Sequence, residues 1–298
     1  MSAGPGPDIG RYLQEAAAAV SAYLEGVFPP GSEPVRLFEA MNYSLLCGGK
    51  RIRPVLCLAA AETFGTPRDV AMPAAAALEL VHTYSLIHDD LPAMDNDDLR
   101  RGRPTNHRVF GEATALLAGD GLLTAAFELL ARPLGIPAKR QLKMIETLAH
   151  AAGPHGMVGG QEADMEAEHS DGTLEALAFI HRRKTGMLIQ ASVVIGGLFA
   201  DLSDAERRAL SAFGIEIGHA FQIIDDWLDV SGDPAVLGKQ TGADERQQKL
   251  TYPSLVGLEA TRRMAEDRLA VAIGALRDAG VEAPLLVGLA EYVVRRDR

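Results

Sequence analysis

The sequence is poor in cysteine, aromatic side chains and positive charge. It contains two cysteines among 298 residues, and 5% of its residues are aromatic. Cys47 and Cys57 cannot form a disulfide framework and stand in apolar surroundings, so we expect both to be small core residues. The 29 basic residues are outnumbered by 40 acidic ones, which gives a net charge of −11. Proteins that bind nucleic acid by neutralising its phosphates carry the opposite balance, so no nucleic-acid partner is expected.

Targeting and membrane signals are also missing. The first residues, MSAGPGPDIGRYL, lack the basic and apolar regions of a secretory signal. The most apolar long segment, residues 186–200, contains Gln190 and is shorter than the roughly 20 residues that span a bilayer. We therefore expect a soluble, cytoplasmic protein without stable membrane insertion.

Two kinds of catalytic apparatus are absent. No phosphate-binding loop of the Walker type occurs, which argues against nucleotide hydrolysis by that route. No Ser/His/Asp or Cys/His arrangement for nucleophilic catalysis stands out either.

Helical periodicity dominates what remains. Alternating β-branched and polar residues are almost absent, whereas segments rich in alanine and leucine recur throughout. Residues 203–206 (SDAE) form a capping-box pattern that opens a helix. The apolar residues that follow step by three and four, as one helix face requires: Phe213, Ile217, Ala220, Ile224 and Leu228. We predict one all-α domain over residues 1–298, with residues 1–10 flexible, although the length alone would suggest about two domains.

The first group of charged residues follows the apolar segment LELVHTYSLIH. Asp89, Asp90 and Asp95 lie within seven residues, and Asp97 and Asp98 follow. Pro92 interrupts the helix, which places the first two carboxylates at a helix C-terminus. A solvated helix end is the alternative, but hard oxygen ligands at this density are typical of a Mg²⁺ site.

A second acidic group lies inside the helix that follows residue 203. Asp225 and Asp229 share one face with Gln222, and Asp226 lies about 100° away around the helix. An exposed acidic patch is again the alternative. Because the rest of this helix is apolar, the carboxylates need partners, and a metal ion would provide them.

Basic residues form local clusters in spite of the negative balance. Residues 48–54 (GGKRIRP) place three cations after paired glycines, which suits an anion. Further basic residues lie in other segments: Lys184 follows His181, Arg182 and Arg183, Lys239 follows Gly238, and Lys249 precedes residues 250–253 (LTYP). Two acidic groups with several basic anchors are most simply explained by Mg²⁺ bridging a diphosphate.

These motifs resemble those of the trans-isoprenyl diphosphate synthases, specifically the bacterial farnesyl (geranyltranstransferase) type. The resemblance extends from about residue 37 to the C-terminus and rests on GGKRIRP, HDDLPAMD, GGQEAD, HRRKTG, FQIIDDWLD, GDPAVLGK and KLTYP. It implies an orthogonal helical bundle around a central cavity, usually a homodimer. It also implies Mg²⁺, about three ions with Mn²⁺ as an alternative, and the joining of isopentenyl diphosphate to an allylic diphosphate.

The resemblance assigns roles to individual residues. Asp89, Asp95 and Asp225 would hold metal, with Asp90 supporting and Asp229 nearby. Together with Arg100 and Lys184, the carboxylates Asp89, Asp90, Asp95 and Asp225 would form the catalytic set. The allylic site would comprise Arg100, Lys184, Thr185, Gln222, Lys239 and Lys249, and the isopentenyl site Lys50, Arg53, His82 and Arg101.

Product length in such enzymes depends on residues just before the first aspartate, here Tyr84 and Ser85. The bulky ring of Tyr84 resembles the pattern of farnesyl synthases, so we expect a C15 product. A geranylgeranyl (C20) synthase is the alternative. A catalytically silent partner of a synthase is a further alternative, although all six motif aspartates are present.

Overall fold

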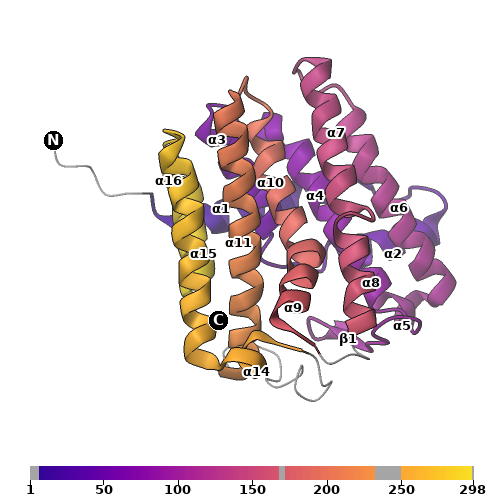
Figure 1. The fold of residues 1–298 in the computed structure, drawn as a ribbon. Helices are drawn as coiled ribbons and strands as arrows, with labels where there is room; N and C mark the ends of the chain where they lie inside the picture. The colour runs from indigo at the N-terminus through magenta and orange to yellow at the C-terminus, as the bar shows by residue number, and fades with distance from the viewer. Residues whose placement is uncertain (1–6, 168–171, 232–249, 297–298) are drawn as a thin grey trace.

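The structure is a computed structural model that describes residues 7–167, 172–231 and 250–296. Its elements run from α1 to α16 with one π-helical turn, η1 (Figure 1). Their bounds are α1 (Ile9–Glu25), α2 (Val35–Leu45), α3 (Ile52–Thr63), α4 (Arg68–Asp89), β1 (Leu99–Arg100), β2 (Arg103–Pro104), α5 (Asn106–Phe110), α6 (Glu112–Ala131), α7 (Ala138–Ala152), α8 (Met157–Ala167), α9 (Leu174–His181), η1 (Arg182–Gly186), α10 (Met187–Gly197), α11 (Asp204–Ser231), α14 (Tyr252–Val256), α15 (Leu258–Asp278) and α16 (Pro284–Arg295).

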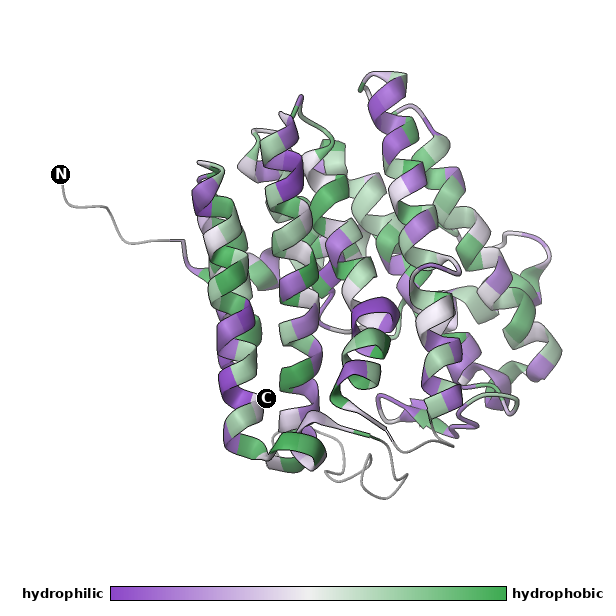
Figure 2. Ribbon diagram, in the orientation of Figure 1, coloured by the Kyte–Doolittle hydropathy of each residue, from purple (hydrophilic) through white to green (hydrophobic). Residues whose placement is uncertain are grey.

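Three helices, α3, α4 and α10, form the centre of the bundle, and most of their residues are buried. Helix α4 packs on α3 and α6, and α10 packs on α3 and α11. Helix α15 covers α11 from outside. On the outer helices, hydrophilic and hydrophobic residues alternate in bands, so that one side of each faces the core (Figure 2).

Helix α11 confirms the prediction made from periodicity. The hydroxyl of Ser203 accepts a hydrogen bond from the Glu206 amide at 3.2 Å, and the Glu206 carboxylate accepts one from the Ser203 amide at 2.7 Å. This reciprocal capping box starts a helix of 28 residues. Its buried face contains the apolar residues that the sequence placed there.

The all-α prediction is confirmed, since the strands in the described residues are a single antiparallel pair of two residues each. At the N-terminus, helix α1 begins at Ile9, inside the segment that we expected to be flexible. Asp8 caps it by accepting a hydrogen bond from the Arg11 amide at 3.0 Å, and Ile9 packs against Gly288 of α16.

The length and apolar character of two helices were underestimated from the sequence. Helices α4 and α6 are long and apolar enough to span a membrane by length and composition alone, whereas we took residues 186–200 as the most apolar segment. Within the bundle, 72% of the most apolar window of α4 and 44% of that of α6 are buried. The core helix of a soluble protein passes the same test.

Candidate functional site

The first acidic motif lies where α4 ends. Asp89 is the last helical residue and Asp90 the C-cap, as Pro92 predicted. The chain then turns back, and the Asp95 amide donates to the Asp89 carbonyl at 2.9 Å. Asn96 has a φ of 52°, a left-handed conformation that asparagine tolerates better than most residues. This turn brings Asp95 back to the helix end that carries Asp89.

Asp89 borders a cavity of about 420 Å³ between α4, α8 and η1. Burial, assisted by the charge of Asp95, raises the pKa of Asp89 to about 6, although Lys184 and Arg100 oppose the shift. Burial and the neighbouring carboxylates therefore destabilise the negative charge of Asp89, and a divalent cation bound to its carboxylate would stabilise that charge.

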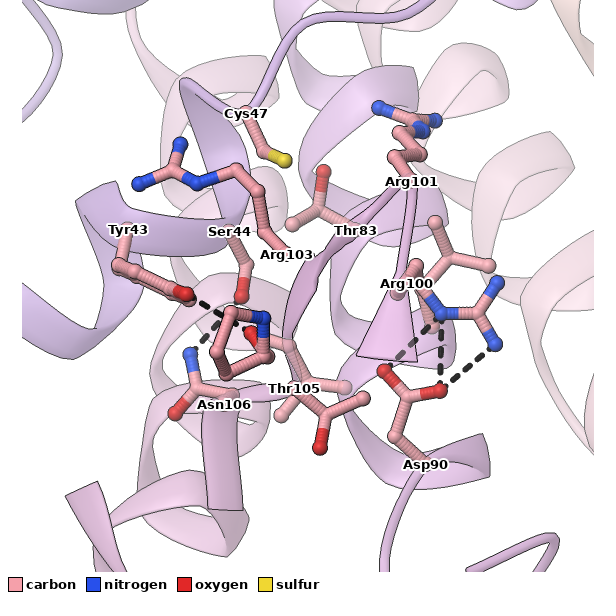
Figure 3. Close-up of a pocket in the computed structure, with 13 residues that line it drawn as sticks. Tyr43, Ser44, Cys47, Thr83, Asp90, Arg100, Arg101, Arg103, Thr105 and Asn106 are labelled. Atoms are coloured by element: carbon pink, nitrogen blue, oxygen red, sulfur yellow. Dashed lines mark hydrogen bonds and ion pairs between the residues drawn. The ribbon is translucent and has the colours of Figure 1, made fainter. Parts of the chain in front are cut away.

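Asp90 faces away from this cavity and pairs with Arg100, the end residue of β1. The Arg100 Nε donates to both carboxylate oxygens of Asp90 at 2.8 and 2.9 Å, and a second guanidinium nitrogen lies 2.7 Å away (Figure 3). The two residues line a small pocket of about 30 Å³ with Cys47. Asp90 therefore fixes the position of Arg100, and both residues line this small pocket and not the 420 Å³ cavity that Asp89 borders. Cys57 is fully buried, as expected, whereas Cys47 is half-buried at this pocket.

The paired glycines of GGKRIRP receive Arg101. Gly49 has a φ of 125°, and a Cβ there would lie 2.6 Å from the Arg101 guanidinium, which also donates to the Gly48 carbonyl. A second cavity, of about 250 Å³, opens beside this loop. The predicted isopentenyl-site residues all line it: Lys50, Arg53, His82 and Arg101.

Arg51 is a residue whose role the sequence did not reveal. It has a φ of 51° and forms a buried ion pair with Glu79 of α4 at 2.5 Å, while another of its nitrogens donates to the Leu45 carbonyl at 2.8 Å. Although GGKRIRP contains Arg51, nothing in the sequence identifies Glu79 as its partner. The pair anchors the basic loop and neutralises the acid at its base.

Arg53 and His82 line both cavities, so the two cavities lie next to each other. Burial, together with the neighbouring arginines, lowers the pKa of His82 well below its usual range. Burial also lowers the pKa of Arg53, although Glu79 and Asp225 oppose the shift. His82 is therefore a neutral imidazole at pH 7, and the positive charge of this shared wall comes from arginine.

Lys184 and Thr185 lie on the π-helical turn η1, a type of distortion that is frequent at functional sites. Lys184 borders the 420 Å³ cavity and pairs with Asp164 of α8 at 2.7 Å. Burial works against the charge of Lys184, but Asp164 and Asp89 raise its pKa. Thr185 donates to the Gln222 amide oxygen at 2.9 Å, which connects η1 to the second acidic motif.

The second acidic motif lies near the C-terminal end of α11. Asp225 is half-exposed and pairs with Arg296, which follows α16 and is 8% exposed. The same guanidinium lies over the Phe221 ring, 4.3 Å from its centroid. Asp226 and Asp229 are buried, at 4% and 2% exposure. A cation of the chain thus already occupies the carboxylate predicted to hold a metal.

In the part of the chain that the structure describes, no three His, Cys, Asp or Glu side chains form a ready-made metal cluster. The donors nevertheless suit Mg²⁺, because Asp89 is a carboxylate that lines a cavity, Asp95 lies close enough to raise its pKa, and burial disfavours the charge of Asp89. Carboxylates repel one another when no cation is bound, so we expect the motif aspartates to lie apart from one another in this structure.

Tyr84 and Ser85, the residues predicted to set product length, line the 420 Å³ cavity about one turn before Asp89. Tyr84 is 5% exposed and packs edge-on against His88, with centroids 5.6 Å apart. Ser85 donates to the His82 carbonyl at 2.9 Å, so its hydroxyl is held by its own helix. Met157, Val158 and Met165 of α8 provide further apolar wall.

Some predicted residues lie outside the described ranges, and some functional ones were missed. Lys239 and Lys249 fall in residues 232–249, outside the described part. The roles of Asp164 and Arg51 were missed because each depends on a partner far along the chain. Asp164 lies in the GGQEAD motif, and Arg296 lies among the basic residues at the C-terminal end of the chain. The sequence of each segment shows the charged residue but not the residue that it pairs with.

Comparison with known proteins gives concordant matches. A family model described as polyprenyl synthetase matches residues 34–282. The chain is 47% identical over 289 residues to a farnesyl diphosphate synthase of Geobacillus stearothermophilus, covering 96% of this chain and 97% of the relative. It is 46% identical over 294 residues to the chloroplastic geranylgeranyl pyrophosphate synthase 7 of Arabidopsis thaliana, covering 97% and 84%.

The fold also matches solved structures. An apo crystal structure of an FPP/GFPP synthase from Zymomonas mobilis superposes with a TM-score of 0.84 at 37% identity, covering 96% of this chain and 99% of that one. The similarity of fold therefore extends over nearly the whole length of both chains.

Proposed function

Since the chain belongs to the polyprenyl synthetase family, we propose that this prenyltransferase condenses isopentenyl diphosphate with an allylic diphosphate, dimethylallyl or geranyl, to give farnesyl diphosphate and pyrophosphate. The observation that carries the proposal is the pair of adjacent cavities with a shared wall of Arg53 and His82. One is lined by cations, and the other combines Asp89 and Lys184 with apolar side chains. Two diphosphates could bind side by side with their hydrocarbon parts together.

We propose that a divalent cation completes the site. Asp89 and Asp95, supported by Asp90, would hold about three Mg²⁺ ions together with Asp225 and Asp229 of the second acidic motif, and Mn²⁺ could replace them. Such ions would supply positive charge that stabilises the departing pyrophosphate more than the bound substrate.

The side chains of the protein themselves contribute positive charge near the leaving group and an apolar wall that excludes water. Lys184 and Arg100 keep their positive charge beside the allylic diphosphate and oppose the negative charge that grows on the leaving oxygen as the C–O bond breaks. Met157, Val158, Met165 and Tyr84 exclude water from the allylic cation.

The second substrate is held by the basic loop. Lys50, Arg53 and Arg101 bind its diphosphate, which directs the C4 olefin carbon towards the allylic C1. The new carbon–carbon bond forms there, and the C2 proton leaves to the adjacent pyrophosphate, which is the basic group at hand. Because His82 is neutral, it adds a hydrogen-bonding group without further charge.

Two kinetic variants test the separation of the sites. Lys50→Gln should raise KM for isopentenyl diphosphate about tenfold with little change in KM for the allylic substrate, because one charged contact of about 1.4 kcal/mol is lost. Lys184→Gln should do the reverse. If both variants raised the same KM, the assignment of two diphosphate sites would be wrong.

The proposal extends to assembly and environment. We propose a cytoplasmic homodimer without stable membrane insertion, supported by exposed leucines on the neighbouring helices α6 and α7. Leu116, Leu117 and Leu142 are 47%, 56% and 65% exposed, which is costly for an isolated subunit. Light scattering should give twice the chain mass of 31.8 kDa, and the single-chain mass would contradict the dimer.

A further inference from the structure

Tyr252 is fully buried and connects to the second acidic motif through its backbone. It is the first residue of α14, and its amide donates to the Asp226 carboxylate at 3.0 Å. Amides in the first turn of a helix have no acceptor within that helix. Asp226 supplies one, and its negative charge makes the bond stronger than a neutral one.

The side chain of Tyr252 reaches α11 at a second point. Its hydroxyl lies 2.5 Å from His219 Nε2. Burial, followed by the charges of Arg268 and Arg182, lowers the pKa of His219 to about 4, and burial raises the pKa of Tyr252. The phenol therefore keeps its proton and donates, and the neutral imidazole accepts.

His219 and Asp226 are seven residues apart, which places them on the same face of α11 about two turns from each other. Tyr252 bridges these two turns with its amide at one end and its hydroxyl at the other. Its ring also packs beside His181 of α9, with centroids 5.5 Å apart. Asp225, adjacent in sequence, points instead to Arg296.

We propose that Tyr252 is a positioning residue that, anchored by His219, holds Asp226 and the end of α11 so that Asp225 is presented to a divalent cation. This rests on the proposed function only in taking the second acidic motif as a metal site. Partners behind a metal ligand commonly change affinity about 10–100-fold when removed. The hydroxyl acts one bond further away, so its loss should have a smaller effect, roughly fivefold.

The test measures Mn²⁺ binding to the whole chain by electron paramagnetic resonance of free Mn²⁺, with no substrate present. Tyr252→Phe keeps the ring and the amide but removes the hydroxyl, and its dissociation constant should rise about fivefold. His219→Leu should give the same rise, and His219→Gln, which restores an acceptor, should bind nearly as the unchanged chain does. Tyr23→Phe on α1 is the matched control and should leave binding unchanged.

The double variant Tyr252→Phe/His219→Leu separates positioning from general loosening. If the two groups act as one unit, its dissociation constant should equal that of either single variant. Additive losses, or lower melting temperatures with unaltered Mn²⁺ binding, would overturn the proposal. If Tyr252→Phe does not fold by circular dichroism, the His219 pair decides the question. A chain that makes no prenyl product but shows these Mn²⁺ shifts would refute the proposed function and leave this inference standing.

Discussion

At the scale of the residue, the first acidic motif combines two aspartates in different environments. Asp90 is neutralised by Arg100, whereas Asp89 lies against a cavity, where burial makes its charge costly. The sequence predicted both as a pair of carboxylates at a helix end. It could not predict that Asp90 forms an ion pair while Asp89 lines a cavity, because Arg100 reaches Asp90 only after the chain has folded back through β1.

Asp89→Asn should stabilise the metal-free protein while turnover falls by about 10² or more. The pKa of Asp89 is about 6 in the folded chain and about 4 in an unfolded one. The folded protein therefore binds the extra proton between these values, and its free energy of unfolding falls as pH rises through that window.

The gain in Asp89→Asn should consequently be about 1–2 kcal/mol above pH 6 and vanish below about pH 4. Thermal unfolding in chelator at pH 4 and pH 7.5 measures it. Equal melting temperatures for the variant and the unchanged chain at pH 7.5 would show that the charge of Asp89 does not destabilise the folded protein.

Tyr84 tests the depth of the hydrocarbon cavity. Its ring is 5% exposed and lines the 420 Å³ cavity beside His88, so Tyr84→Ala should lengthen that cavity. Products longer than C15 should appear in chromatographic sizing. Thr83→Ala, a neighbouring residue that lines the small Asp90 pocket instead, is the control. An unchanged C15 product from Tyr84→Ala would mean that the ring does not limit chain length.

At the scale of the element, helices with strong periodicity and caps were predictable, and their distortions were not. The capping box at Ser203 and the apolar face after Leu210 identified α11. The π-helical turn was not apparent, because HRRKTG continues a helical pattern. The turn packs closely against α8 and α11, and its Gly186 meets Gly218 of α11 backbone to backbone.

Gly218→Ala should disturb this contact. A Cβ at Gly218 would lie 2.6 Å from the Cα of Gly186, so η1 must move and carry Lys184 with it. Overpacking of this kind costs about 1–3 kcal/mol. We expect a lower melting temperature and a higher KM for the allylic substrate.

Gly274→Ala on α15 is the matched control. Its Cβ would meet only the Arg277 guanidinium at 3.9 Å, so the change should be neutral or stabilise the chain by up to about 1 kcal/mol. If Gly218→Ala behaved in the same way, close packing of η1 would not position Lys184.

At the scale of the whole molecule, the bundle gathers charges that the sequence scatters. The ends of α4 and α11 and the loop before α3 are far apart in the chain, yet Arg53 and His82 connect their cavities. The six motif aspartates make up a large part of the −11 net charge, and three divalent cations would cancel them. The distribution of the acidic residues therefore favours diphosphates bound through metal ions as the ligands of this chain.

The most direct measurement incubates the purified chain with Mg²⁺, isopentenyl diphosphate and geranyl diphosphate, and identifies the product by mass. The proposed function predicts farnesyl diphosphate with one pyrophosphate released per condensation, and no product when chelator replaces Mg²⁺. A predominantly C20 product, or none above background, would contradict it.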